Sequence, residues 1–129
     1  NVFKVSSRIN STWGGNLVDM VRSSQILQII EEDKLCENAA VVGSYLQEGL
    51  LQLASKFGQI SNVRGKGLMC AFDFPNKDMR DAFLKKGMEE NVMFLGCGNQ
   101  TIRFRPALCM EPKHIDEGLS VMDRILPSL

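Results

Sequence analysis

Two arginines, Arg103 and Arg105, are the side chains of this sequence best suited to bind a small carboxylic acid. They stand in the run Thr101-Ile-Arg-Phe-Arg-Pro106, where polar and apolar residues alternate. Alternation on a strand points both guanidiniums to one face, with Ile102 and Phe104 on the other. A guanidinium is always charged and offers a planar pair of N–H donors that matches a carboxylate. The alternative is that both arginines are solvated or paired with surface acids.

Two other stretches could bind an anion. Ser11-Thr-Trp-Gly-Gly15 places hydroxyls and flexible backbone N–H groups directly before a helix that begins after Asn16. The alternative interpretation is that its serine and threonine only cap that helix. Arg64-Gly-Lys-Gly67 has two cations and two glycines, but it lacks the spacing of a phosphate-binding loop, so a strained turn between two strands is the favoured interpretation.

The metal-binding and nucleophilic residues form no recognisable cluster. His114 is the single histidine, and Cys36, Cys70, Cys97 and Cys109 contain no C-x-x-C pair, so we expect no metal site. Cys36 and Cys70 lie in apolar patterns and are expected to be small core residues. No nucleophile–base pair or dinucleotide fingerprint occurs at motif spacing, which indicates that the chain by itself is not a complete active site.

Composition is typical of one globular domain. The chain has 129 residues, 44% of them hydrophobic, and its fifteen basic residues balance fifteen acidic ones. Zero net charge argues against nucleic acid and anionic membranes as partners, and no apolar run approaches the roughly 20 residues of a membrane span. Four cysteines without a disulfide pattern indicate free thiols in a reducing compartment, so we expect a cytoplasmic protein.

The elements that would position these side chains follow from the hydrophobic period. Helical spacing begins after the N-cap Asn16 and again after Asp33, and Gly58 ends the second helix. We expect strands at 60–63, 68–74 and 92–95 and around the two arginines, with a turn at 64–67, a hairpin loop at 96–100 and helices at 77–90 and from 112. One core would be shared by Phe57, Phe72, Phe104 and Leu119.

This order, α-α-β-β-α-β-β-α, predicts the fold class. It is α/β in the two-layer, α+β sense, with helices packed on one face of a small, mainly antiparallel sheet. Residues 1–15 are apolar without a period, and the chain begins at Asn1 rather than at Met. We interpret that segment as an arm that packs on something outside the chain, as in a piece of a larger protein.

Three motifs occur in an order that resembles the class III aminotransferases, which are fold-type I enzymes dependent on pyridoxal 5'-phosphate. They are Asn10-Ser-Thr-Trp-Gly-Gly-Asn16, Val63-Arg-Gly-Lys-Gly-Leu-Met69 and Thr101-Ile-Arg-Phe-Arg-Pro106. The resemblance covers essentially the whole chain and implies a C-terminal small domain, 16–129, preceded by a segment, 1–15, that leads from a large domain. Within the class the motifs are most similar to those of lysine 6-aminotransferases, with the 4-aminobutyrate and ornithine enzymes as relatives.

The resemblance implies roles for few residues. Thr12 matches a threonine that reaches the cofactor phosphate of the other subunit of a homodimer. Arg103 matches the arginine that binds the substrate α-carboxylate, or that pairs with an active-site glutamate when the amino donor is turned around. Asn10 matches a residue that lines the same pocket, and Arg105 is expected to support the strand or the pocket rim. The lysine that carries the cofactor belongs to the large domain, and no lysine of this chain lies in a matching motif, so no catalytic residue is assigned.

The implied function is transfer of the terminal amino group of an amino acid, the 6-amino group of L-lysine, to 2-oxoglutarate by the full-length, pyridoxal-phosphate-dependent enzyme. The chain alone would then be inactive. The alternative is a free-standing module for carboxylate binding or dimerisation, in which Arg103 and Arg105 hold a regulator. The apolar arm at 1–15 favours the first hypothesis, because an independent module has no reason to carry it.

Overall fold

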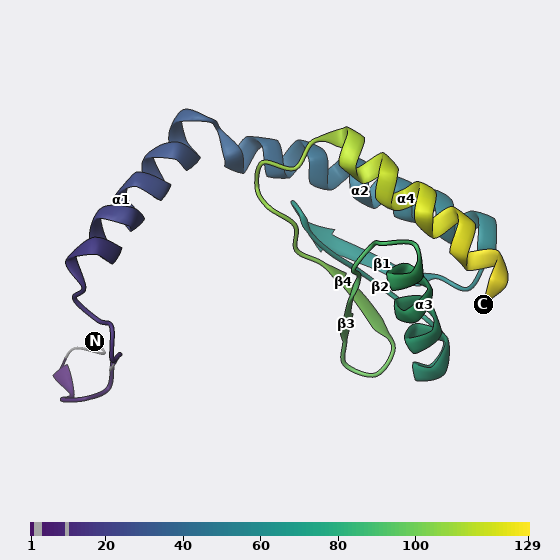
Figure 1. Ribbon diagram of the computed structural model, residues 1–129, viewed down its shortest axis with the longest axis horizontal. Helices are drawn as coiled ribbons and strands as arrows, with labels where there is room; N and C mark the ends of the chain where they lie inside the picture. The colour runs from purple at the N-terminus through teal and green to yellow at the C-terminus, as the bar shows by residue number, and fades with distance from the viewer. Residues whose placement is uncertain (2–3, 10) are drawn as a thin grey trace. The chain divides into compact units, whose positions relative to one another are not determined.

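The computed structural model describes residues 1, 4–9 and 11–129, which form two compact units, Asn1–Lys34 and Leu35–Leu129. The element order is α-α-β-β-α-β-β-α, as the sequence predicts (Figure 1). The expected division between an arm, 1–15, and a small domain, 16–129, stays a prediction. No helix of the described ranges is long and apolar enough to cross a membrane.

The first unit contains one long helix, α1 (Leu17–Glu32). Asn16 is its N-cap, as predicted, because its side-chain oxygen accepts hydrogen bonds from the backbone N–H groups of Val18 at 2.9 Å and Asp19 at 3.2 Å. All sixteen residues of α1 are described, and none is buried. Its leucines, valines and isoleucines therefore face solvent in this chain, so α1 gains little stability from packing.

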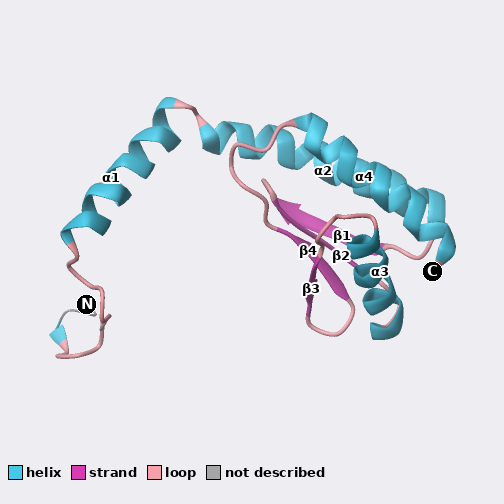
Figure 2. Cartoon of the chain, in the orientation of Figure 1, coloured by secondary structure: helices cyan, strands magenta, loops and turns pink. Residues whose placement is uncertain are grey.

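The second unit is built on a four-stranded antiparallel sheet in the order β1-β2-β4-β3 (Figure 2). Its strands are β1 (Ser61–Lys66), β2 (Met69–Asp73), β3 (Leu95–Cys97) and β4 (Thr101–Phe104). Strand β2 pairs with β1 on one side and with β4 on the other, and β3 pairs with the far side of β4. Strand β4 is therefore an inner strand, and its backbone is paired on both flanks.

Helices cover one face of this sheet. They are α2 (Leu35–Phe57), α3 (Lys77–Glu89) and α4 (Pro112–Ile125), the last continued by the short 3₁₀ helix η2 (Leu126–Ser128). In Figure 1, α2 and α4 run side by side along the sheet, and α2 contacts both β1 and β2. The predicted stripe of α2 is buried against the sheet because residues three and four apart share a helix face.

The core lies between these helices and the sheet and is rich in phenylalanine. Phe72 and Phe83 are fully buried, with ring centroids 6.1 Å apart. Phe57, Phe104 and Leu119 are half-buried and pack at the edge of the same core. The predicted shared core is therefore confirmed, because each of these residues lies on the apolar side of its element.

Two strand predictions are wrong in their bounds. Arg64–Lys66 belong to β1 rather than to a turn, and only the step through Gly67 and Leu68 turns the chain. The glycine at 65 serves strand pairing, since a Cβ there would lie 2.5 Å from the backbone oxygen of Met69. The third strand begins at Leu95, not Val92, because the backbone N–H of Val92 still donates to Gly87 at the end of α3.

The burial of the cysteines differs from the prediction at one position. All four are free thiols, and Cys70 is buried in the core as expected. Cys36 is exposed, so its assignment to the core is wrong. It stands at the second position of α2, six residues before Val42, where the buried part of that helix begins, so it lies beyond the stretch of α2 that packs on the core.

Candidate functional site

Strand β4 presents Arg103 on the face of the sheet that is opposite the helices of the second unit. Ile102 is fully buried on the helix side, whereas Arg103 is exposed, as alternation along a strand requires. Arg103 stands opposite Ala71 of β2 on one flank and Leu95 of β3 on the other. Because Ala71 carries only a methyl group, it does not wall off the guanidinium on that flank.

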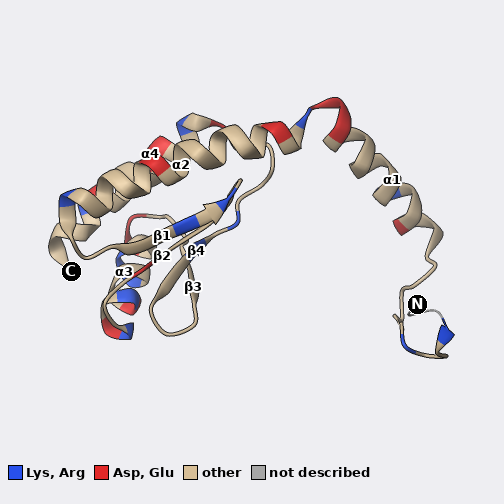
Figure 3. Cartoon of the chain, turned by 180° about the vertical axis from the view of Figure 1, so that it is seen from behind, with Lys and Arg blue, Asp and Glu red and all other residues tan. Residues whose placement is uncertain are grey.

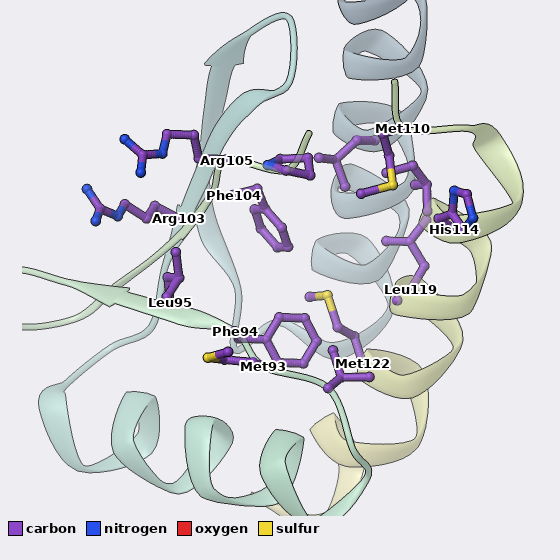
Figure 4. A pocket seen from close by; sticks show the side chains of 15 residues that line it. Met93, Phe94, Leu95, Arg103, Phe104, Arg105, Met110, His114, Leu119 and Met122 are labelled. Atoms are coloured by element: carbon purple, nitrogen blue, oxygen red, sulfur yellow. The ribbon is translucent and has the colours of Figure 1, made fainter. Parts of the chain in front are cut away.

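Arg105 follows on the same side of the chain. Figure 4 shows both guanidiniums projecting away from Phe104, Met110 and Leu119. Within the ranges that the structure describes, neither arginine side chain has a hydrogen-bond or ion-pair partner. Pairing with surface acids, the alternative interpretation of this motif, is therefore not formed in the described chain, and both guanidiniums are available to a ligand.

An apolar cavity of about 230 Å³ lies between β4 and α4. Arg103 and Arg105 contribute to its lining from the strand, but their guanidiniums point away from its interior (Figure 4). Apart from the two arginines and His114, every side chain of the lining is apolar, and apolar surroundings do not satisfy a carboxylate. The open face of the sheet therefore suits a carboxylate better than this cavity, whose apolar lining includes Phe94, Phe104, Met110, Leu119 and Met122.

A buried carboxylate, Asp73, stands on the same open face at the end of β2. It pairs in register with Thr101, whose hydroxyl donates to its Oδ1 at 2.6 Å. The side-chain amide of Asn62 donates to its Oδ2 at 2.7 Å, and the guanidinium of Arg64 donates to Oδ1 at 3.1 Å. Three strands thus meet at one carboxylate, which ties the start of β4 to β1 and β2.

The ionised form of Asp73 is favoured by this network. Burial raises the pKa of its carboxyl, but hydrogen bonds from Thr101, Asn62 and Arg64, together with the charge of Arg64, more than offset that effect and leave the pKa below its ordinary value. The network depends on a bulge in β1 between Ser61 and Arg64, where Asn62 adopts a left-handed backbone with φ of 51°. That bend turns the Asn62 amide toward Asp73.

The charges on this face are mainly positive. In Figure 3 blue segments mark Lys and Arg on β1 and near β4, with a red segment on β2 between them. The red segment corresponds to Asp73, whose charge is matched by Arg64. The other positive charges on this face, those of Arg103, Arg105 and Lys66, have no ion-pair partner among the described residues.

The other predicted site residues lie in the first unit or outside the described residues. Thr12 is exposed in a turn stabilised by a bond from the backbone N–H of Gly14 to the carbonyl of Ser11 at 3.1 Å. Asn10 lies outside the described residues. The structure brings Arg103 and Arg105 together within one unit, whereas Thr12 belongs to the other unit.

Comparison with known proteins identifies the family. Residues 1–126 match the family described as aminotransferase class-III. The chain belongs to the class III aminotransferases. One relative is the L-lysine-epsilon aminotransferase of Amycolatopsis lactamdurans, 45% identical over 99% of this chain and 29% of the relative. Another is the mitochondrial 4-aminobutyrate aminotransferase of Sus scrofa, 37% identical over 92% of this chain and 24% of the relative.

A solved structure of lysine aminotransferase from Mycobacterium tuberculosis has the same fold. It superposes with a TM-score of 0.90 at 43% identity, over 99% of this chain and 30% of that one. The chain therefore spans less than a third of the length of the class III aminotransferases that it matches. Members of this family are pyridoxal-phosphate enzymes.

Two described residues, one in each unit, carry groups that suit a pyridoxal-phosphate enzyme. The exposed hydroxyl of Thr12 can donate to a phosphate oxygen, and Arg103 can hold a substrate carboxylate. That the chain contributes no lysine to carry the cofactor stays a prediction. Lys56 pairs with Asp123 at 2.6 Å and Lys86 donates to Ser128 at 2.9 Å, both at the surface on the helix side.

Sequence reasoning missed Asp73, Asn62 and Thr101 as parts of the site. Asp73 alternates with Phe72 and Phe74, which places it opposite the core and was sufficient to put a carboxylate on the face of Arg103. Its partners could not be identified in the same way, because the bulge in β1 shifts the register by which Asn62 and Arg64 reach it.

Proposed function

We propose that the chain is the C-terminal part of an aminotransferase that moves the 6-amino group of L-lysine to 2-oxoglutarate. The observation that carries the proposal is the guanidinium of Arg103 on the open face of the sheet, which has no partner among the described residues. It stands in a chain 45% identical to an L-lysine-epsilon aminotransferase. Both proposed substrates carry carboxylates, so one guanidinium can serve the amino donor and the acceptor.

Arg103 binds the α-carboxylate of lysine through two parallel N–H donors. An inner strand holds the backbone of Arg103 on both flanks, so the guanidinium starts from a fixed position. Holding the carboxylate end of lysine leaves the 6-amino group, at the other end of the molecule, free to face the cofactor. Arg105 adds positive charge at the rim of this site and supports the same strand end.

Thr12 donates its hydroxyl to the phosphate of pyridoxal phosphate in the neighbouring subunit of a homodimer. Asn10 lines the substrate pocket beside it. When bound, pyridoxal phosphate supplies the electron sink on which transamination depends. The chain by itself supplies only some of the residues of this site, so we propose that it is inactive alone. We also propose that the full-length enzyme acts in the cytoplasm.

The test is Arg103→Lys in the full-length enzyme. The lysine side chain keeps the positive charge but lacks the planar pair of N–H donors. The KM for the substrate L-lysine should therefore rise about ten- to a hundredfold, which corresponds to roughly 1.5–3 kcal/mol. Arg105→Lys is the matched control and should change the KM less, because Arg105 lies beyond the paired part of β4. Unchanged KM values for both lysine and 2-oxoglutarate in Arg103→Lys would refute the carboxylate role.

The proposed inactivity has its own measurement. The 129-residue chain, incubated with pyridoxal phosphate, L-lysine and 2-oxoglutarate, should form no glutamate, and borohydride should trap no cofactor on it. A cofactor absorption band that survives desalting and is fixed to one lysine by borohydride would contradict this part of the proposal.

A further inference from the structure

Arg64 and Arg103 flank the same small residue on the open face of the sheet. Ala71 of β2 pairs with Arg64 on one side and with Arg103 on the other. Neighbouring strands lie about 4.8 Å apart, so the backbones of the two arginines are about 10 Å apart. Asp73 follows Ala71 by two residues and therefore points to the same face, at a diagonal position to each arginine. Diagonal pairs are within reach of long side chains.

One carboxylate therefore has two arginines within reach, and in the structure it pairs with only one of them. Arg64 donates to Asp73 Oδ1 at 3.1 Å and to the backbone oxygen of Asn62 at 2.8 Å. The bulge in β1 provides this second acceptor, and no described residue offers Arg103 an equivalent one. Two acceptors hold Arg64 in place, and its charge compensates the charge of Asp73.

We propose that Arg64 is a positioning residue for the site at which Arg103 binds the substrate carboxylate. By pairing with Asp73, Arg64 keeps the Asp73 side chain from pairing with Arg103 and so from competing with the substrate. This inference rests on the proposed function of Arg103. It also assigns a role to Arg64, the first of the two cations in the Arg64-Gly-Lys-Gly67 motif, whose first three residues belong to β1.

Loss of Arg64 would leave an uncompensated charge beside the site. Thr101 and Asn62 would still bond to Asp73, but both are neutral. A carboxylate has about four lone-pair positions and can accept a further donor, and Arg103 carries the nearest unpaired guanidinium on this face. An Arg103–Asp73 pair would then form in a fraction of the enzyme molecules. The apparent affinity for substrate carboxylates would fall in proportion to the molecules in which Arg103 is paired.

The experiment compares four variants of the full-length enzyme by steady-state kinetics with L-lysine and 2-oxoglutarate. Arg64→Gln should raise the KM for lysine about fivefold with little change in kcat, the size expected for a partly exposed ion pair. Lys66→Gln removes the same charge from the same strand without touching Asp73 and should leave the KM near that of the parent. The double variant Arg64→Gln/Asp73→Asn should bring the KM back toward the parent value. Arg103→Lys reports on the proposed function itself.

The outcomes separate the inference from the function on which it rests. If Arg64 only stabilised the fold, removing the charge of Asp73 as well would not restore the KM for lysine. Recovery of the KM in the double variant therefore supports the positioning role. If Arg103→Lys raises the KM but Arg64→Gln does not, or if the double variant is no better than Arg64→Gln, the positioning role is wrong and the carboxylate site stands. If Arg103→Lys leaves the KM unchanged, both are overturned. Circular dichroism of each variant confirms that it is folded.

Discussion

Replacing Phe72 with alanine is expected to lower the free energy of unfolding by about 4 kcal/mol. The ring is fully buried, and its centroid lies 5.2 Å from that of Phe74, 6.1 Å from Phe83 and 6.0 Å from Phe104. Truncation of a buried phenylalanine to alanine costs about 3–5 kcal/mol, and aromatic neighbours add to the loss. Because this ring joins the sheet to α3, the cavity left behind cannot be filled by movement of one element alone.

Urea unfolding followed by far-ultraviolet circular dichroism measures this effect. With a slope near 2 kcal/mol per molar urea, the midpoint should fall by about 2 M. Fluorescence would be a poor probe, because the single tryptophan, Trp13, is 73% exposed and lies in the first unit. The matched control is Met69→Ala, at a residue of the same strand that is 65% exposed on the opposite face and should cost less than about 0.5 kcal/mol. Equal midpoints for the two variants would show that the faces of β2 are assigned wrongly.

Two further predictions concern the buried carboxylate and the cofactor contact. Because the pKa of Asp73 is lowered in the folded state, its ionised form stabilises the fold above the unfolded pKa of about 3.9, and this contribution is lost as the pH falls through the folded pKa. The difference in unfolding free energy between the parent chain and Asp73→Asn should therefore be largest near pH 7 and shrink below pH 4 in urea titrations; a difference that does not vary with pH would count against an ionised network. In the full-length enzyme, Thr12→Ala should release pyridoxal phosphate more readily in equilibrium dialysis, while Thr12→Ser keeps the hydroxyl and retains the cofactor. Equal loss from both variants would argue against the hydroxyl contact.

Local rules were enough to predict the elements and the direction of the arginines. The N-cap at Asn16, the three- and four-residue steps of α2 and the proline at 112 each act within a few residues, and each helix forms where they indicate. Alternation alone places Arg103 opposite Phe104, because successive side chains of any strand point to opposite faces. The family motifs then named Arg103, Thr12 and Asn10, and the roles of all three stay predictions.

Only the tertiary structure decided which residues stand beside Arg103. The neighbours of Arg103 come from strands 32 residues earlier in the sequence and 8 residues earlier, at Ala71 and Leu95, and strand pairing sets that register. The bulge at Asn62, with its left-handed backbone, determines which arginine occupies Asp73, and no local pattern in 61–66 indicates it. Side-chain alternation is a property of a single strand, whereas the partners of a buried charge depend on how several strands align. For that reason the sequence alone predicted the exposed guanidinium, and the fold determined that it is left free.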